Sequence, residues 1–413
     1  SEAQFLDQNL QTIDINKKLD LLYVELFQVF RNAFDLEKSV YIPWEERNHD
    51  LVIVFSPQVL GMEHAPTKTL LDRCYVLKKQ LKKEVIIINT AMQMPAKGQA
   101  PFYRLSNATY ADELSQIDHL EFKGETFEFY QCENKMPDLD IIAAVIRMIK
   151  SMKPEVIISI GGCDICADLC GLFIPQVTIS TVFSKIAISC GKYQMVDKKL
   201  SIEDKEELAI LGVDPQNVKR TTFTFSFKEQ THNYTKEQLG IDSSKFVILI
   251  VGWRLDQEID DQFLDMIDLI LQEKKNIQIV FMGKFDTYKE KIQKYEEIEK
   301  NSINLGKQED ALAVVECCNL YVNPQRRGGG SSAAEALYKG LPVVTLPIGD
   351  VAVVAGRTFW VKNYADMKTQ IIKYDIDTEY YRNNSQKAKR KAKKLLDSNE
   401  FVKGIEDIVT KKD

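Results

Sequence analysis

A glycine-rich turn between an apolar strand and a helix offers the clearest chemistry in this sequence. Residues 323–344 read Asn-Pro-Gln-Arg-Arg-Gly-Gly-Gly-Ser-Ser-Ala-Ala-Glu-Ala-Leu-Tyr-Lys-Gly-Leu-Pro-Val-Val. Glycine lets a backbone approach a phosphate closely, and the first N–H groups of a helix lack intrahelical acceptors and favour an anion. The turn therefore predicts a phosphate site made of Asn323, Arg326, Arg327, Gly328, Gly329, Gly330, Ser331, Ser332 and Glu335.

The charged residues of this turn have separate expected roles. Arg326 or Arg327 can make a bidentate contact with a diphosphate. Glu335, one turn into the helix, can accept hydrogen bonds from ribose hydroxyls. A turn that only packs a strand against a helix is the alternative, but the combination of three glycines with two arginines, two serines and an acid favours the anion site.

Alternating strand and helix patterns supply the elements that position this turn. Runs such as Leu-Val-Ile-Val-Phe at 51–55 are continuous and apolar, which is typical of parallel strands covered by helices on both faces. The first half is predicted to have helices within 1–49, strands at 51–55, 85–88, 156–160, 176–180 and 221–227, and helices at 67–81 and 138–152. The second half is predicted to have strands at 246–251, 277–282, 302–305, 320–322 and 342–346, and helices at 261–272, 289–299, 309–317 and 331–339.

The fold class that follows is α/β, with two Rossmann-like domains and extra N-terminal helices. We expect an N-terminal domain over 1–230, a C-terminal domain over 231–376, and helices in 377–413 that pack back across the linker. Open parallel sheets bind ligands beyond the carboxyl ends of their strands, so we expect the two sheets to face a shared cleft.

Composition narrows the classes of protein that fit. The chain has 413 residues, of which 45% are apolar and 28% charged, with a net charge of −6. This acidic balance argues against nucleic acid as a partner, and no run approaches the ~18 apolar residues of a membrane span. The first residues lack the basic-then-apolar build of a signal peptide. Several of the eight cysteines sit in apolar runs, so a reducing cytoplasm is the expected location.

Two Rossmann-like domains with a late phosphate signature resemble the GT-B glycosyltransferases. The stretch Tyr321–Leu346 looks like the donor site of the protein O-linked N-acetylglucosamine transferase group, where a Gly-His-Thr-Thr turn holds the diphosphate and an acid three positions later holds the ribose. The counterparts here would be Gly330, Ser331, Ser332 and Glu335. The histidine of that group is replaced by Gly330, which leaves the arginines as the expected source of positive charge.

The same stretch also resembles the retaining group with a Glu-x7-Glu motif. Glu335 would be the second glutamate, but position 327 is arginine, and no acidic residue lies between Pro324 and Ala334. This departure favours inversion of the anomeric configuration over retention.

The resemblance adds three cations to the predicted donor site. Arg254 follows the first strand of the second domain, where GT-B enzymes often place an arginine that faces the donor phosphates. Lys284 ends the next strand in the same orientation. Lys307 lies in the loop 305–310, where family members hold the base through backbone contacts.

The loop 56–67 in the first domain carries the predicted catalytic residues. An inverting transferase needs a group that takes the proton of the acceptor hydroxyl, and histidine or a carboxylate is the usual choice. His64 is the leading candidate and Glu63 the second. The alternative for His64 is a structural hydrogen bond that fixes the loop.

The resemblance implies a glycosyltransferase that moves a glucose- or N-acetylglucosamine-type hexose from a UDP-sugar to a protein or a glycan- or lipid-linked acceptor. No metal and no cofactor other than this co-substrate is expected, and Asp256 is expected to begin a helix. A non-catalytic binding subunit of a glycosylation complex is one alternative. A UDP-sugar 2-epimerase is another, but only Glu63 and Asp164 are acids at strand ends of the first domain.

Two further clusters invite a special function. Cys163, Cys166 and Cys170 have a ligand-like spacing, but they belong to an apolar segment and are expected to be buried in the core. The basic run Lys387–Lys394 predicts a solvated helix face, or a contact with an anionic membrane surface or an acidic partner chain. Such a contact would place the protein at the inner face of the membrane.

Overall fold

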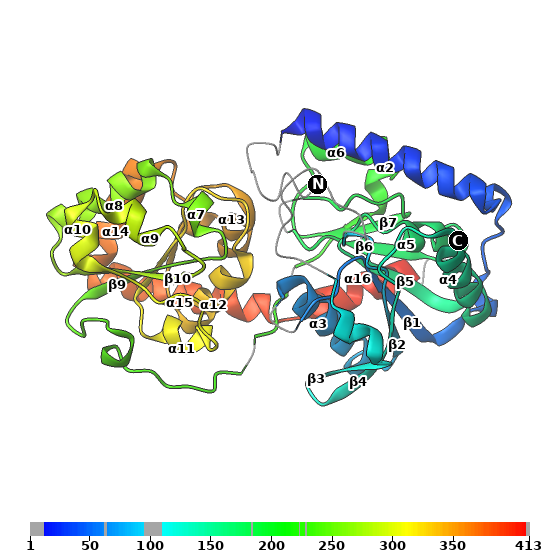
Figure 1. Ribbon diagram of the computed structural model, residues 1–413, viewed down its shortest axis with the longest axis horizontal. Helices are drawn as coiled ribbons and strands as arrows, with labels where there is room; N and C mark the ends of the chain where they lie inside the picture. Colours follow the sequence, from blue (N-terminus) through cyan, green and yellow to red (C-terminus); the bar gives the residue numbers. More distant parts are fainter. Residues whose placement is uncertain are drawn as a thin grey trace. The chain divides into compact units, whose positions relative to one another are not determined.

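The computed structural model describes residues 12–61, 64–94, 110–182, 185–222, 224–227 and 229–409. The chain forms two compact units (Figure 1). Unit 1 comprises Ser1–Ser226 and Ser398–Asp413, and unit 2 comprises Phe227–Asp397. The C-terminal segment predicted as one part, 377–413, is therefore divided between the units after Asp397.

Unit 1 is built on an eight-stranded sheet with the order β3-β4-β2-β1-β5-β6-β7-β8. All neighbouring strands are parallel except β3 and β4, which form an antiparallel hairpin at one edge. The strands are Asn48–Ser56 (β1), Glu84–Asn89 (β2), His119–Phe122 (β3), Glu125–Gln131 (β4), Pro154–Ile160 (β5), Gln176–Ile179 (β6), Tyr193–Val196 (β7) and Val218–Arg220 (β8).

Helices cover both faces of this sheet, which explains why β1 and β5 are apolar runs without alternation. The helices are Ile13–Ala33 (α2), Ala65–Lys79 (α3), Leu139–Met152 (α4), Ile165–Cys170 (α5), Ile202–Leu211 (α6) and Asn399–Val409 (α16). α2, α4, α5 and α6 share one core with the sheet. On the other face, the guanidinium carbon of Arg73 in α3 lies 4.6 Å from the centre of the Phe401 ring in α16.

Four parts of unit 1 differ from the prediction, and one of them is the helix α6, which has no predicted counterpart. β7 and the β3–β4 hairpin were not predicted as strands. β7 has only four residues, and the side chains of the hairpin alternate between exposed and buried, so neither resembles the long apolar strands. The predicted strand 221–227 has no strand among its described residues, because β8 ends at Arg220 at the edge of the sheet and 221–227 leads into unit 2.

Unit 2 is built on a five-stranded parallel sheet with the order β11-β10-β9-β12-β13. Its strands are Phe246–Gly252 (β9), Ile277–Gly283 (β10), Ser302–Asn304 (β11), Leu320–Val322 (β12) and Val343–Val344 (β13). Its helices are Leu255–Glu258 (α7), Asp261–Glu273 (α8), Tyr288–Ile292 (α9), Glu296–Asn301 (α10), Ala311–Glu316 (α11), Gly330–Lys339 (α12), Gly349–Ala355 (α13), Tyr364–Ile376 (α14) and Thr378–Leu395 (α15).

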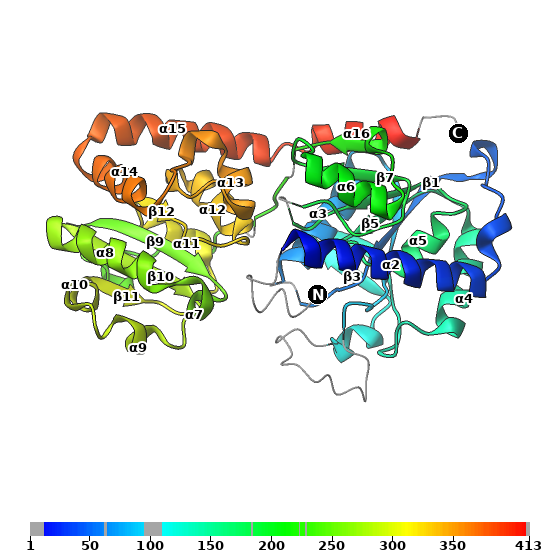
Figure 2. The ribbon, with the colours of Figure 1, turned by 90° about the horizontal axis from the view of Figure 1, so that it is seen from above.

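The helices of unit 2 also form two layers. α8, α9, α10 and α14 share an apolar core with one face of the sheet, while α11, α12 and α15 lie on the other side. Figure 2 shows the long helix α15 passing α12, α13 and α14, with which it is in contact. The predicted helix 289–299 is divided into α9 and α10, and α13 and α14 were not predicted. Among the helices of the described residues, none combines the length and the apolar character that a bilayer crossing requires.

Candidate functional site

The carboxyl ends of β9 and β10 approach each other closely through two glycines. Gly252 and Gly283 are partners in the register of these strands. Gly283 has a φ of +118°, and a Cβ atom there would lie 1.9 Å from the carbonyl oxygen of Gly252. Only glycine fits this position, and the approach brings the predicted cation loops together: the N–H of Lys284 donates to Gly252 O at 3.0 Å.

Asp256 fastens the two loops further. Its Oδ1 accepts from the N–H and the hydroxyl of Thr287, at 2.7 and 2.6 Å, and its Oδ2 accepts from the N–H of Asp286 at 3.2 Å. Asp256 lies in α7, as predicted, and its carboxylate is used within the protein. Within the described ranges, no group of three His, Cys, Asp or Glu side chains has a metal-binding arrangement.

The glycine-rich turn opens α12 without a side-chain cap. Gly329 is the N-cap residue with a φ of +96°, and as a glycine it has no side chain that could cap the first turn. Helix geometry leaves the N–H groups of Gly330, Ser331 and Ser332 without intrahelical acceptors and directed out of the helix start. N–H groups in this geometry can receive an anion, and they lie next to the end of β12.

The two serines of the turn have different surroundings. The hydroxyl of Ser332 donates to Gly329 O at 2.9 Å and lies 2.9 Å from the hydroxyl of Tyr321 in β12. Ser332 therefore stabilises the turn with its side chain and can offer its backbone N–H to a ligand. Ser331 and Glu335 are half-buried in the first two turns of α12.

Arg326 is a structural residue, which corrects the expectation that it contacts a diphosphate directly. Its side chain is 2% exposed. It donates from Nε to Asn323 Oδ1 at 2.7 Å, from one terminal nitrogen to Glu258 Oε2 at 2.8 Å, and from the other to the Tyr321 hydroxyl at 2.9 Å. Asn323 is itself buried by this contact, and it donates to Thr345 Oγ1 at 3.2 Å. Asn323 and Arg326 therefore support the glycine-rich turn from the protein interior.

Arg254 takes the place at the turn that was expected for Arg326. Its side chain is 20% exposed, and its Nε and a terminal nitrogen donate to Glu258 Oε1 at 3.2 and 3.0 Å. A Cβ atom on Gly328 would lie 3.3 Å from this guanidinium group. Arg327 is exposed, and its carbonyl oxygen accepts from the N–H of Asp350 at 2.7 Å. The loop after β9 thus supplies a partly exposed guanidinium group beside Gly328, in addition to the buried guanidinium group of Arg326 beside Gly329.

The two predicted lysines lie at the same edge of the sheet. Lys284 is 38% exposed, and its Nζ lies 3.4 Å from a carboxylate oxygen of Asp286. Lys307 is exposed in the loop after β11, next to Gly306, whose carbonyl oxygen accepts from the N–H of Gly283 at 2.8 Å. β9, β10, β11 and β12 therefore each contribute to one edge.

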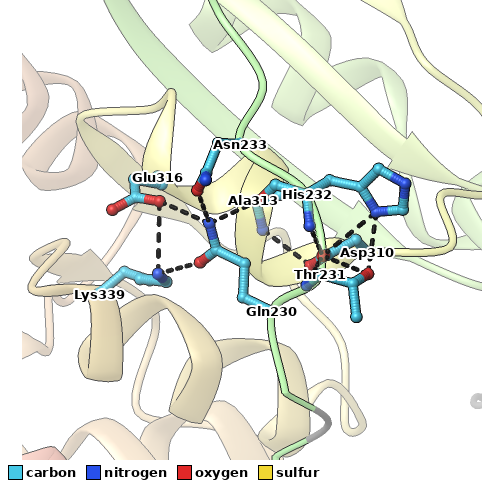
Figure 3. A network of polar contacts seen from close by, with 8 residues as sticks. All are labelled: Gln230, Thr231, His232, Asn233, Asp310, Ala313, Glu316 and Lys339. Carbon is cyan, nitrogen blue, oxygen red and sulfur yellow. Dashed lines mark hydrogen bonds and ion pairs between the residues drawn. The ribbon is translucent and has the colours of Figure 1, made fainter.

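A polar network fastens the beginning of unit 2 to helices α11 and α12 (Figure 3). Asp310 caps α11 and also accepts from the N–H groups of Thr231 and His232 at 2.6 and 2.9 Å. Lys339, at the end of α12 opposite the glycine turn, bonds to Gln230 and lies 3.4 Å from a carboxylate oxygen of Glu316. The segment 230–233 therefore holds α12 at its C-terminal end.

In unit 1, His64 lies at the N-cap of α3 after the loop that follows β1. Its Nδ1 is 2.9 Å from Thr67 Oγ1, which also accepts from the N–H of Leu60 at 3.1 Å. Burial lowers the pKa of His64 to about 4, so the imidazole is neutral at pH 7. The structure thus shows the loop-fixing hydrogen bond, and the catalytic role of His64 stays a prediction. Glu63 lies outside the described residues.

Asp164 is a buried carboxyl group at the end of β5. It follows Gly161, Gly162 and Cys163, which all have positive φ. The carboxyl group accepts from the Thr90 hydroxyl at 2.7 Å, and it caps α5. Burial raises the pKa of Asp164 to about 7. Cys166 and Cys170 in α5 are fully buried, as expected.

The second unit matches a known protein family. Residues 245–374 match the family model described as glycosyl transferases group 1. This match identifies a glycosyltransferase domain and confirms the expected class of enzyme. No curated protein sequence matches the chain.

Solved structures that resemble the chain have the same architecture. An O-GlcNAc transferase mutant from Thermobaculum terrenum has a TM-score of 0.60 and 14% identity, over 89% of this chain and 68% of that chain. Anabaena Alr3699/HepE in complex with UDP and glucose has a TM-score of 0.58 and 13% identity, over 87% and 99%. TarM has a TM-score of 0.60 and 10% identity, over 88% and 99%. These likenesses confirm the GT-B fold expected from the sequence.

Proposed function

Because the chain has a GT-B fold and carries a glycosyl transferases group 1 domain, we propose that it transfers a hexose from a UDP-sugar to a protein or to a glycan- or lipid-linked acceptor. The observation that carries this proposal is the uncapped start of α12 beside the guanidinium group of Arg254. The solved structures of HepE contain UDP and UDP-glucose, which supports UDP as the nucleotide.

The edge of the unit 2 sheet fits the charge that develops in such a reaction. As the bond between the sugar and the diphosphate breaks, negative charge grows on the leaving phosphate oxygens. Backbone N–H groups of α12, the guanidinium group of Arg254 and the ammonium group of Lys284 stabilise such a charge when they are already in place. These groups occupy the role that a metal ion has in other transferases, so we propose that transfer continues in EDTA.

His64 is proposed to accept the proton of the acceptor hydroxyl. Its lowered pKa keeps the imidazole neutral, which is the state that can take up a proton. In the tautomer with hydrogen on Nδ1, Thr67 accepts the hydrogen bond and Nε2 keeps its lone pair. His64→Asn should lower kcat strongly while UDP still binds, because the change leaves the donor site intact.

The direct test of the donor class is a thermal-shift titration. UDP and UDP-sugars should raise the melting temperature, whereas NAD should not. Incubation with UDP-glucose or UDP-N-acetylglucosamine and candidate acceptors, followed by mass spectrometry, then identifies the product. A shift with NAD and none with any uridine nucleotide would contradict the proposal.

A non-catalytic binding subunit is the second candidate. It is favoured by two observations: position 327 is arginine where the retaining group has a glutamate, and the Ser332 hydroxyl is used within the turn. If UDP binds while no acceptor receives sugar, and His64→Asn changes nothing, this candidate is the better one. A 2-epimerase agrees less well with the structure, because Asp164, one of its two expected acids, is fully buried. Such an epimerase would release an epimerised UDP-sugar when no acceptor is present.

A basic face on α15 supports a location at an anionic membrane surface. Its exposed cations are Arg382, Lys387, Lys389, Arg390, Lys393 and Lys394. The sequence has no acidic residue from 380 to 396, and the exposed residues of α15 between 382 and 394 are cations and amides. Lysine is depleted in the cores of protein interfaces, while each lysine near an anionic bilayer contributes about 1 kcal/mol.

Vesicle sedimentation tests this location. The protein should bind vesicles with anionic lipid at low salt and should be released at high salt. A variant with Lys389, Arg390 and Lys393 changed to glutamate should lose binding, while the same number of exchanges at the exposed residues Lys289, Lys300 and Lys275 should matter less. Equal binding by both variants would contradict the assignment to α15.

A further inference from the structure

A single buried carboxylate links the two arginines of the unit 2 site. Glu258 is the last residue of α7, and its side chain is 3% exposed. Its Oε1 accepts from two nitrogens of Arg254, and its Oε2 accepts from Arg326 at 2.8 Å. Glu258 and Arg326 are 68 positions apart in the chain. The three groups together carry a net charge of +1.

Arg326 is held on all sides and forms the fixed end of this chain of contacts. Its nitrogens bond to Asn323, Tyr321 and Glu258. Two glycines leave room for it: a Cβ atom on Gly252 or on Gly329 would lie 2.6 Å from one of its terminal nitrogens. A guanidinium group with three partners and no space to move fixes the carboxylate that it contacts.

Arg254 is the end of the chain of contacts that reaches the ligand side. Its carbonyl oxygen accepts from the N–H of Glu258 at 2.9 Å, so one helical turn places the two side chains together. An arginine has several rotatable bonds, and ordering it when a ligand binds costs free energy. Because Glu258 already holds two of its nitrogens, Arg254 meets a diphosphate in a prepared position.

We infer that Glu258 is a positioning residue for the diphosphate, acting through Arg254 and not by touching the ligand. This inference rests on the proposed function, since it names the residue that prepares the proposed donor site. Glu258 also separates two like charges that would otherwise share a buried space. Its carboxylate thus allows the buried Arg326 and the ligand-binding Arg254 to lie close to each other.

The inference is specific to the phosphates and not to the nucleoside. Loss of the Glu258 charge should weaken binding of UDP, whose diphosphate needs Arg254, and leave binding of uridine unchanged. A general loss of folded protein would weaken both ligands alike. The ratio of the two affinities therefore separates positioning from a purely structural role.

The test is a double-mutant cycle measured by calorimetry with UDP and by competition with uridine. Glu258→Gln and Arg254→Met should each weaken UDP binding about tenfold or more, the effect of losing one charge-assisted hydrogen bond. The double variant should be no weaker than Arg254→Met alone, because Glu258 acts through Arg254. Glu297→Gln is the control, since Glu297 of α10 forms an ion pair with Lys275, and this variant should bind UDP normally.

Outcomes of three kinds contradict the inference. If Glu258→Gln binds UDP as the wild type does, or if its effect adds fully to that of Arg254→Met, Glu258 does not act through Arg254. If Glu258→Gln loses uridine and UDP equally, its role is structural. If the wild-type protein binds no UDP at all, the proposed function fails as well, which the other two outcomes leave intact.

Discussion

At the carboxyl end of the unit 2 sheet, buried ionisable groups contact groups of opposite charge, whereas at the same end of the unit 1 sheet burial shifts the pKa values of Asp164 and His64 toward their neutral forms. Glu258 stays between two guanidinium groups, with direct hydrogen bonds to both. Asp164 has hydroxyl and amide partners only, and its pKa rises to about 7. His64 is buried and has a pKa of about 4.

The difference shows how similar α/β scaffolds suit different tasks. A site for a diphosphate needs permanent positive charge, and arginine paired with a single carboxylate supplies it. In unit 1, burial without an opposite charge shifts the pKa of each group toward its neutral form, upward for Asp164 and downward for His64. The predictions that follow test this contrast, beginning with the largest expected effect.

Gly329→Ala should damage the unit 2 site most. The residue has a φ of +96°, and a Cβ atom would lie 2.6 Å from Arg326, so backbone and guanidinium group must both move. We expect UDP affinity to fall roughly a hundredfold, measured by calorimetry. Gly240→Ala is the matched control, because Gly240 also has a positive φ but has no atom within 4 Å of its Cβ position. Equal effects would show that backbone strain alone matters.

Arg254→Met should weaken UDP binding by about ten- to a hundredfold, because it removes the guanidinium group beside Gly328. Lys284→Met should have a smaller effect, because the ammonium group is 38% exposed and lies near Asp286. Titration of both variants at two salt concentrations measures this order. A larger effect at Lys284 would contradict this order, because it would mean that the paired, half-buried guanidinium group of Arg254 is not the main contact of the diphosphate.

Asp164→Asn should change how the stability of unit 1 depends on pH. The pKa of Asp164 is about 7 in the folded chain, against 3.8 for the free side chain. The contribution of this proton to the free energy of unfolding is complete below pH 3.8 and is lost as the pH rises through 7, because the folded state binds the proton more tightly than the unfolded state. The melting temperature of the variant relative to the wild type should therefore increase from pH 5 to pH 8. Asp140→Asn, an exposed change, should show no such trend.

His64→Gln should give a smaller pH effect of opposite sign. The folded pKa of about 4 lies below the ordinary value of 6.5, so this contribution is present above pH 6.5 and is lost as the pH falls through 4. The melting temperature of the variant relative to the wild type should increase by a few degrees on acidification from pH 7 to pH 4. No change would indicate that the imidazole is less buried than the structure shows.

Local patterns were sufficient for much of the fold. The strands β1, β5, β9 and β10 are apolar runs that could be read directly, and the start of α12 was predicted within one residue of Gly330. The short strand β7 and the β3–β4 hairpin were missed, because four residues or alternating exposure give a weak signal. α13 was missed because its seven residues follow a proline-containing turn.

The site was predicted less evenly. Arg254, Lys284 and the glycine turn were placed at one edge because parallel strands share their carboxyl ends. Arg326 and Arg327 could not be told apart from sequence, although one is buried and the other exposed. The signal that could have drawn attention to Glu258 was its spacing of four residues from Arg254 within a helix start.

The sequence by itself determined which segments become strands, where α12 begins, and which residue types gather at the carboxyl end of each sheet. These properties depend on neighbours along the chain, such as apolar runs and glycines. Only the tertiary structure decided which arginine faces the solvent and which carboxylate lies between two guanidinium groups. Hydrogen-bond partners 68 positions apart and the depth of burial decide such questions, and neither is a local property of the chain.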